Sequence, residues 1–212
     1  MSLFITGTDT GVGKTHTVVQ LLRLLRAVGK RCAGMKPICC GDRDDATLLL
    51  AASSEHLTID EINPLWLKTP AAPLAAALVE DVAIDKGILL RSFESLQKKV
   101  DTVLVEGVGG WLVPITDGYF MSDLARDMKL PVMVVAQNRL GCLNHTLLTV
   151  RSVREMGLKC AAVVLNEPGA KSDVATSTNR ELLERLLDVP ILSGLGETTP
   201  ILPADWVQAM GG

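Results

Sequence analysis

The stretch Gly7-Thr8-Asp9-Thr10-Gly11-Val12-Gly13-Lys14-Thr15 decides the fold. Residues 2–6 before it form a short run that predicts a buried strand, and apolar residues recur at helical spacing over 18–25. Strand, glycine-rich turn and helix in this order are the context of a phosphate-binding loop. The glycines let backbone N–H groups curl around an anion, and the helix N-terminus adds partial positive charge.

Two side chains complete the loop. Lys14 is placed to reach β- and γ-phosphate oxygens of a nucleotide, and the Thr15 hydroxyl to bind Mg²⁺. A plain strand–helix turn would explain the glycines, but a lysine in a first helical turn is unfavourable against the helix dipole. The loop is a variant, because Thr8 stands where the usual motif has glycine and the glycine is one position earlier, at Gly7.

The composition bounds the class of protein. The chain has 212 residues, 48% hydrophobic and 21% charged, and only seven aromatic residues (one Tyr, three Phe, three Trp), which predicts a globular protein with an aliphatic core. A net charge of −3 gives no reason to expect nucleic-acid binding, and no apolar run is long enough for a membrane span. The five cysteines lack C-x-x-C spacing and no signal peptide precedes the loop, so we expect a cytoplasmic protein.

Strand and helix patterns alternate along the rest of the chain. Strands are expected at 31–36, 102–105, 131–136, 159–165 and 190–196, and helices at 46–52, from Pro73, at 85–99, 122–128, 144–156 and 173–187, and briefly in the tail. We find no linker or internal repeat. The sequence therefore predicts one domain, residues 1–212, with a doubly wound, mostly parallel α/β sheet and helices on both faces.

Functional side chains follow three of these strands, at the edge where open parallel sheets bind ligands. Lys36 ends one strand, with a solvent-facing lysine as the alternative. Glu106 ends the next and precedes a glycine cluster, which favours an acid that meets Mg²⁺ over a capping or salt-bridged glutamate. Asn166 ends a third, where its amide would read a base edge or simply form a turn.

Other candidates stay open on the residues alone. Asp42, Asp44 and Asp45 either cap the following helix or ligate Mg²⁺. Residues 141–144 form a helix N-terminus with free N–H groups, hence a carboxylate site, and His145 beside them is expected to be structural. Together, Lys14, Thr15, Lys36, Glu106 and one aspartate predict a Mg²⁺-dependent, ATP-using enzyme with a small anionic substrate.

Several motifs together resemble the dethiobiotin synthetases. The matching stretches occur in family order and span roughly residues 2–196: they are 7–15, 36–38, 45–46, 105–111, 140–145 and 165–166. The resemblance implies ATP-dependent carboxylation of 7,8-diaminononanoate with CO₂. One amine captures CO₂ as a carbamate, ATP phosphorylates it, and the second amine closes the ring, giving dethiobiotin, ADP and phosphate.

The resemblance also implies roles for particular residues. Lys36 would hold the carbamate and Lys14 would bridge it to the γ-phosphate, as the catalytic pair. Thr15, Asp45 and Glu106 would hold Mg²⁺, and Asn166 the adenine. The implied nucleotide contacts are Asp9, Thr10, Gly11, Val12, Gly13, Lys14, Thr15, Asp45, Glu106, Gly107, Gly109 and Asn166.

The implied substrate site draws on two subunits of a homodimer. Thr10, Lys36 and Cys40 would line the diamine end, with Cys40 standing where many relatives carry the stronger donor serine. The substrate carboxylate would bind a helix start from the neighbouring subunit. That helix start consists of Gly141, Cys142, Leu143 and Asn144.

Two other classes of ATPase compete with this interpretation. Nucleotide-switch ATPases of the partitioning or division-site type share the loop but carry a signature lysine where Asp9 stands, and often end in a basic membrane helix, whereas residues 200–212 hold no Lys or Arg. Cobyrinate-type amidating ATPases usually append a glutaminase domain, for which we expect no room here.

Overall fold

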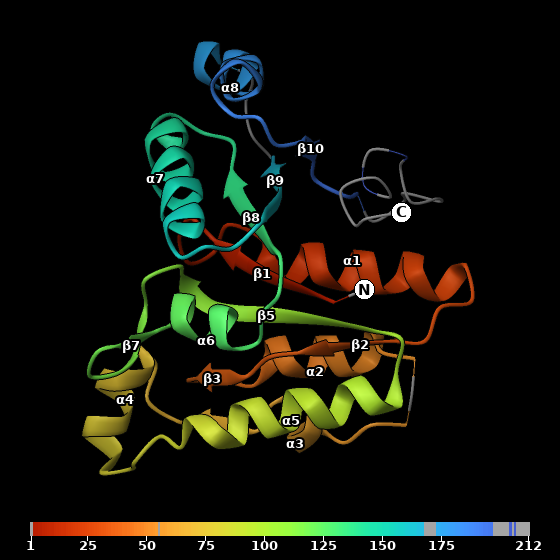
Figure 1. Cartoon of the computed structure of the whole chain (residues 1–212), viewed down its shortest axis with the longest axis vertical. Helices are drawn as coiled ribbons and strands as arrows, with labels where there is room; N and C mark the ends of the chain where they lie inside the picture. Colours follow the sequence, from red (N-terminus) through yellow and green to blue (C-terminus); the bar gives the residue numbers. More distant parts are fainter. Residues whose placement is uncertain (1, 55, 168–172, 197–203, 205, 207–212) are drawn as a thin grey trace.

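A six-stranded parallel sheet forms the centre of the computed structural model, which describes residues 2–54, 56–167, 173–196, 204 and 206 (Figure 1). The strands lie in the order β10-β9-β8-β1-β5-β2, and every neighbouring pair is parallel. Their bounds are β1 (Leu3–Gly7), β2 (Cys32–Met35), β5 (Thr102–Gly110), β8 (Val132–Gln137), β9 (Cys160–Asn166) and β10 (Ile191–Ser193). The predicted mostly parallel α/β fold is confirmed.

Helices cover both faces of this sheet. They are α1 (Lys14–Ala27), α2 (Asp44–Ala52), α3 (Ile59–Ile62), α4 (Pro73–Glu80), α5 (Lys86–Lys99), α6 (Met121–Asp127), α7 (Cys142–Glu155) and α8 (Val174–Leu186). Two small sheets lie beside the main one: β3 (Ile38–Cys40) pairs with β4 (Leu65–Leu67), and β6 (Pro114–Thr116) pairs with β7 (Tyr119–Phe120). None of the described helices is long and apolar enough to cross a membrane.

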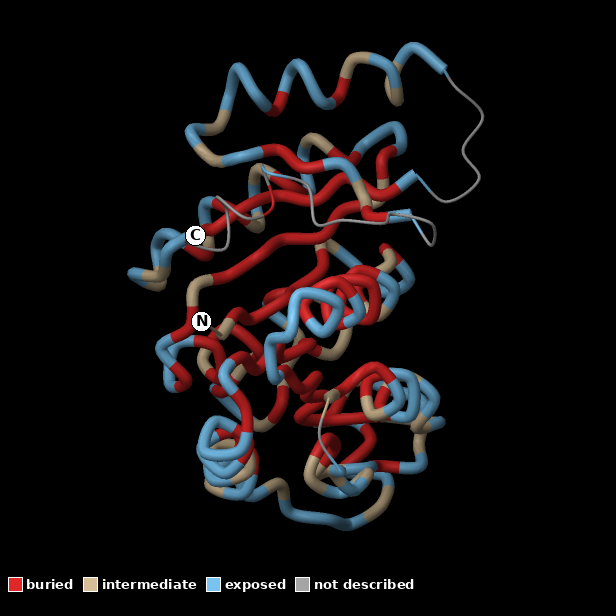
Figure 2. Tube along the Cα trace, turned by 90° about the vertical axis from the view of Figure 1, so that its right-hand side faces the viewer, coloured by how far each residue is buried: buried red, intermediate tan, exposed pale blue. Residues whose placement is uncertain are grey.

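The core has two layers, because successive side chains of a strand point to opposite faces. On β1, Phe4 belongs to the core layer that contains side chains of α5, α6, α7 and α8, whereas Leu3 and Ile5 belong to the layer that contains those of α1 and α2. Figure 2 shows the buried segments running along the strands, with the exposed segments on the outer sides of the helices. Both layers are mostly aliphatic, as the few aromatic residues predict.

The structure corrects several expected boundaries. The strand expected to end before Glu106 continues through Gly110, so Glu106 lies inside β5. A further strand, β3, begins directly after Pro37 because β4 lies alongside to pair with it. Helix α7 begins at Cys142, and Ile88 on α5 is exposed rather than buried. The helix expected in the tail lies mostly outside the described residues.

Glycine at position 34 lets two helices approach β2 closely. A Cβ atom there would lie 2.9 Å from Leu49 Cβ on α2 and 3.0 Å from Leu22 Cδ1 on α1. Real Cβ atoms almost never lie this close to other atoms, so a side chain at position 34 would force itself or one of the two helices to move. The close approach matters for the ligand-binding edge, because α1, α2 and β2 lead to Lys14, Asp45 and Lys36.

We therefore expect Gly34→Ala to lower the free energy of unfolding by about 1–3 kcal/mol, the usual cost of overpacking a core. Gly110→Ala is the matched control, because its Cβ would meet its nearest neighbour at 3.6 Å, an ordinary contact. Urea unfolding of both variants measures the difference. Equal losses in the two variants would contradict the packing argument.

Candidate active site

The loop between β1 and α1 has the backbone of an anion site. Gly13, the N-cap of α1, has a φ of 94°, in the region that favours glycine. A Cβ there would also lie 2.4 Å from the Asn166 amide nitrogen. Lys14 starts the helix and its Nζ donates to the Asp9 carbonyl at 3.0 Å, so the lysine folds back over the loop.

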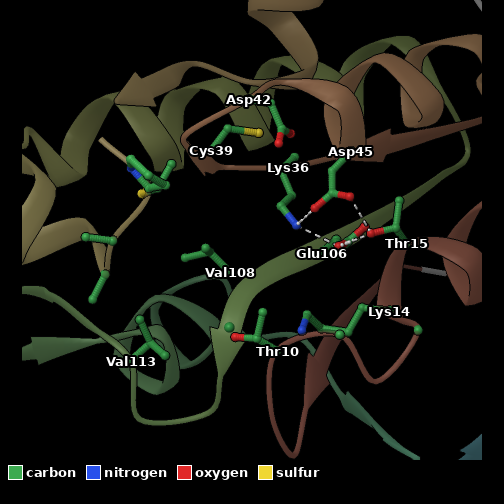
Figure 3. Close-up of a pocket in the computed structure, with 17 residues that line it drawn as sticks. Thr10, Lys14, Thr15, Lys36, Cys39, Asp42, Asp45, Glu106, Val108 and Val113 are labelled. Atoms are coloured by element: carbon green, nitrogen blue, oxygen red, sulfur yellow. Dashed lines mark hydrogen bonds and ion pairs between the residues drawn. The ribbon is translucent and has the colours of Figure 1, made fainter. Parts of the chain in front are cut away.

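This loop forms one wall of a cavity of about 690 Å³ (Figure 3). The opposite wall comes from the end of β2, from β3 and from the start of α2, and it carries Lys36, Cys40 and Asp45. Apolar side chains, Val108 and Val113, line the cavity beyond the loop. The cavity therefore combines a charged floor with an apolar flank.

Four side chains form a closed ring on the charged floor (Figure 3). Lys36 Nζ donates to Asp45 Oδ2 and to Glu106 Oε1, each at 2.6 Å. Thr15 Oγ1 lies 2.8 Å from Asp45 Oδ1 and 2.8 Å from Glu106 Oε1. A cation and a hydroxyl thus alternate with two carboxylates. Lys36 follows β2 and Thr15 lies on α1, whereas the carboxylates come from α2 and β5.

Strand register explains why Lys36 meets Glu106. The last paired residues of β2 and β5 are Met35 and Val105. The next residue on each chain is therefore Lys36 and Glu106, at the point where β2 leaves the sheet and the cavity opens. Both side chains are buried, with 4% of Lys36 and none of Glu106 exposed, so each needs the other as its counter-charge.

The two lysines of the cavity have opposite electrostatic environments. Burial alone would lower the pKa of Lys36, but the Glu106 and Asp45 carboxylates outweigh it and hold that pKa above its ordinary value. Burial and the Lys36 ammonium lower the pKa of Lys14 to about 8. Burial would raise the pKa of the Asp45 carboxyl, but Lys36 and Thr15 hold it below its ordinary value.

The donor set fits Mg²⁺ held jointly with a nucleotide. Glu106 Oε2 is buried and has no hydrogen-bond partner, so this oxygen is available to a ligand. Within the described ranges, no three His, Cys, Asp or Glu side chains form a complete metal site. Mg²⁺ commonly takes one or two carboxylates, and phosphate and water supply its other ligands. Thr15, Asp45 and Glu106 match that incomplete protein set.

A second cavity, of about 410 Å³, lies on the other side of the loop. Gly11 and Gly13 line both cavities, which places the loop between them. Asn166 and the segment 193–196 form its far wall. The Asn166 amide donates to the carbonyls of Val12 at 2.9 Å and Gly13 at 3.3 Å, so this side chain also braces the loop.

Most of the predicted site residues come together. Those that line the larger cavity are Thr10, Gly11, Gly13, Lys14, Thr15, Lys36, Cys40, Asp45, Glu106 and Gly109, and Val12 and Asn166 line the second. Gly107 instead lies against the Phe4 ring, and Asp9 lines a third cavity on the flank of the loop. Asp42 also lines the larger cavity, but Asp45 is the aspartate that contacts Thr15.

The helix start formed by Gly141, Cys142, Leu143 and Asn144 lies outside the larger cavity of its own chain. Gly141 is the N-cap of α7, with a φ of 89°. His145, expected to be a buried structural residue, is exposed at the third cavity. Within one chain, this helix start therefore meets none of the groups on the charged floor.

Sequence reasoning missed several contributions to the site, including the apolar flank at Val108 and Val113. His16 lines the second cavity, and its Nε2 lies 2.7 Å from the Leu195 carbonyl, which joins α1 to the far wall. Its position directly after Thr15 was the available signal. Pro70, Ala71 and Ala72 line the larger cavity, in a segment with no periodicity to indicate it.

Fold and site together define a class of protein. A glycine-rich loop follows a central parallel strand, Lys-Thr begins the next helix, and an acid lies on the adjacent strand. These features are those of a P-loop nucleoside triphosphatase. The model of a family described as an AAA domain matches residues 1–201. Solved structures agree in fold: a signal recognition particle receptor FtsY from Elizabethkingia anophelis has a TM-score of 0.60 at 14% identity and covers 98% of this chain and 64% of its own.

Curated relatives narrow the class. The ATP-dependent dethiobiotin synthetase of Akkermansia muciniphila is 44% identical, over 92% of this chain and 91% of its own length. Those of Aromatoleum aromaticum and Thermodesulfovibrio yellowstonii are 42% and 40% identical, over 89% and 93% of this chain and 87% and 89% of theirs. The chain belongs to the ATP-dependent dethiobiotin synthetase family.

The lowered pKa of Lys14 predicts proton uptake on nucleotide binding. In the free protein Lys14 loses its proton as the pH rises through about 8, whereas bound phosphates favour the ammonium. We expect MgADP binding to take up roughly 0.9 proton at pH 9 and roughly 0.1 at pH 7, as linkage requires. Calorimetry in buffers of different ionisation enthalpy measures this uptake.

Lys14→Arg is the control for this prediction, because a guanidinium keeps its proton at both pH values. Its uptake should fall to near zero at pH 9. The assignment fails if wild type shows no pH-dependent uptake, or if Lys14→Arg retains it.

Proposed function

We propose that this chain converts 7,8-diaminononanoate, CO₂ and ATP into dethiobiotin, ADP and phosphate, as a ligase of biotin biosynthesis. Membership of the family supports this reaction. The observation that carries it is the pair of lysines on facing walls of one cavity, Lys14 on the nucleotide loop and Lys36 at the end of β2. A reaction that joins a carbamate to a γ-phosphate needs a cation for each anion.

The two cavities fit the two ends of a nucleotide. We place the adenine in the second cavity beside Asn166 and the phosphates over the loop, where the glycine N–H groups and Lys14 bind them. The γ-phosphate then enters the larger cavity near Lys36. The Asn166 side-chain oxygen can accept a hydrogen bond from the base, whereas its amide nitrogen could donate to the base only by giving up a hydrogen bond to the loop.

The chemistry follows from this placement. One substrate amine adds to CO₂ and loses a proton, forming a carbamate, which Lys36 holds. The carbamate oxygen attacks the γ-phosphate while Lys14 neutralises the charge between the two anions, and ADP leaves. The second amine attacks the carbonyl carbon of the carbamic–phosphoric anhydride, loses a proton and expels phosphate, closing the ring. The lysines therefore act by holding and neutralising anions.

Two further sets of residues complete this proposal. Thr15, Asp45 and Glu106 would hold Mg²⁺, which when bound neutralises charge on the β- and γ-phosphates. Thr10 and Cys40 would contact the diamine end of the substrate, and the apolar flank at Val108 and Val113 suits its methylene chain. The signature lysine of a switch ATPase would stand at position 9, where this chain has Asp9.

We further propose a homodimer of single-domain, cytoplasmic chains, with each active site near the subunit interface. The third cavity, of about 430 Å³, shares Thr10 and Val113 with the larger one. Its rim exposes 59% of Leu112 and 57% of Leu148. A second subunit covering this surface would bring the α7 start, residues 141–144, to the substrate carboxylate. The five unpaired cysteines fit a reducing compartment.

The reaction predicts a strict dependence on both substrates. ADP formation should require 7,8-diaminononanoate and bicarbonate together, because the γ-phosphate has no acceptor until the carbamate forms. Lys36→Gln should reduce this turnover at least 100-fold, the scale of a lost charge-stabilising donor, while MgADP affinity does not weaken by more than about threefold. Diamine-independent hydrolysis would favour the switch ATPase, and normal turnover in Lys36→Gln would remove Lys36 from the mechanism.

The shared site predicts complementation between two inactive variants. Leu143→Pro removes one N–H group in the first turn of α7, where proline is tolerated, and Lys36→Gln disables the other half. After random subunit exchange, half the dimers carry one intact site of two, so activity should return to about a quarter of wild type. Homodimers of each variant are the controls. No recovery after verified exchange would place both halves in one subunit.

A further inference from the structure

The Lys36 ammonium occupies the two carboxylates that the proposed metal needs. We propose that Lys36 is an internal counter-cation: it neutralises Asp45 and Glu106 in the metal-free protein, and metal binding releases it towards the anionic substrate. This inference rests on the proposed metal-binding role of Thr15, Asp45 and Glu106. It adds that Lys36 and the metal ion compete for the same two carboxylates.

The contacts within the ring show which carboxylate oxygens each cation can use. Lys36 and Thr15 engage both oxygens of Asp45 and Oε1 of Glu106. Glu106 Oε2 is the one carboxylate oxygen of the ring that is buried without a partner. A metal ion that binds through Asp45 Oδ1 and Glu106 Oε2, the oxygens that Lys36 does not contact, would therefore lie on the same two carboxylates as the Lys36 ammonium.

Charge balance makes the metal ion and the Lys36 ammonium compete for these two carboxylates. Two carboxylates face one ammonium in direct contact, and the Glu106 side chain has no exposed surface. A divalent cation in this buried ring, with Lys36 still in place, would leave excess positive charge where the solvent screens it poorly. Repulsion between the two cations then favours movement of the ammonium, which is the mobile partner at the end of a flexible four-carbon chain.

The larger cavity gives the released ammonium a destination. Lys36 lines this cavity, so a change in its side-chain torsions carries Nζ from the ring into the space proposed for the carbamate. The consequence is an order of events: metal and nucleotide bind first, and only then is the Lys36 ammonium free to hold the substrate anion. The same lysine stabilises the empty site and serves the filled one.

Lys14 provides the matched control. Its Nζ donates to the Asp9 carbonyl, and its charge lies near the same carboxylates. However, the structure shows no hydrogen bond or ion pair from Lys14 to Asp45 or Glu106 among the described residues. Removing Lys14 deletes one positive charge from the cavity without vacating the ring, so it separates direct competition from general electrostatics.

The first test measures Mn²⁺ binding without nucleotide, by electron paramagnetic resonance, in wild type, Lys36→Met and Lys14→Met. We expect Lys36→Met to bind Mn²⁺ at least about tenfold more tightly than wild type, and Lys14→Met to change affinity less than about threefold. Equal tightening in both variants would overturn the inference, because it would reflect net charge alone. Unchanged affinity in Lys36→Met would also overturn it.

A second measurement uses the wild-type protein, so it does not depend on a variant that folds. Reductive methylation followed by peptide mass spectrometry reports the accessibility of each lysine amine. Lys36, with 4% of its side chain exposed, should react slowly without metal and at least several-fold faster in saturating Mn²⁺. An unchanged or slower rate for Lys36 in Mn²⁺ would show that the lysine stays in the ring.

Two acid variants separate failure of this inference from failure of the proposed function. If Asp45→Asn and Glu106→Gln weaken Mn²⁺ binding but Lys36→Met does not tighten it more than Lys14→Met, the metal site stands and the competition is wrong. If neither acid variant weakens Mn²⁺ binding, the proposed metal ligands are wrong and the inference fails with them.

Discussion

The contact between the Lys36 ammonium and the fully buried Glu106 carboxylate is the constraint on which the ligand-binding edge depends. A carboxylate with no exposed surface is costly unless a counter-charge and hydrogen bonds compensate for lost water, and removing one partner of such a pair typically costs about 3–5 kcal/mol. Compensation here requires three other elements. The register of β2 on β5 brings Lys36 opposite, α2 brings Asp45, and the first turn of α1 brings Thr15. The ring therefore forms only when all four elements are correctly placed.

Close packing behind the ring holds these elements at the right distance. Gly34 lets α1 and α2 lie against β2, and Gly13 lets the loop pass directly beside Asn166. Larger side chains at these two positions would move the loop or the helix that carries Asp45. The loop, held in this way, lies between the two cavities in which we propose that the base and the reacting groups bind. A Cβ atom on Gly13, which lines both cavities, would lie 2.4 Å from the Asn166 amide nitrogen.

The two lysines of the site show that the environment, rather than the residue type, sets the pKa of a side chain. Lys36 is paired with two carboxylates, which keep it charged despite its burial. Burial and the like charge of Lys36 lower the pKa of Lys14, and bound phosphates would raise it again. A pair of this kind suits a reaction that must bring two anions together. Lys36 pairs with the Asp45 and Glu106 carboxylates of the protein itself, whereas Lys14 contacts only the Asp9 carbonyl among the groups described for it.

The sequence by itself determined the parallel α/β class, the phosphate-binding loop and the placement of Lys36 and Glu106 at one edge, because hydrophobic periodicity and motif spacing are local. Residue types and spacing could not choose among Asp42, Asp44 and Asp45, and only the family resemblance pointed to Asp45, since that choice depends on how α2 is rotated and where it lies relative to Thr15. Sequence reasoning missed β3, which needs β4 as a partner, and the cavity wall at Pro70–Ala72. Tertiary structure alone decided that Lys36 holds two acids at once, because strand register and helix position join residues that are 9 and 70 positions apart.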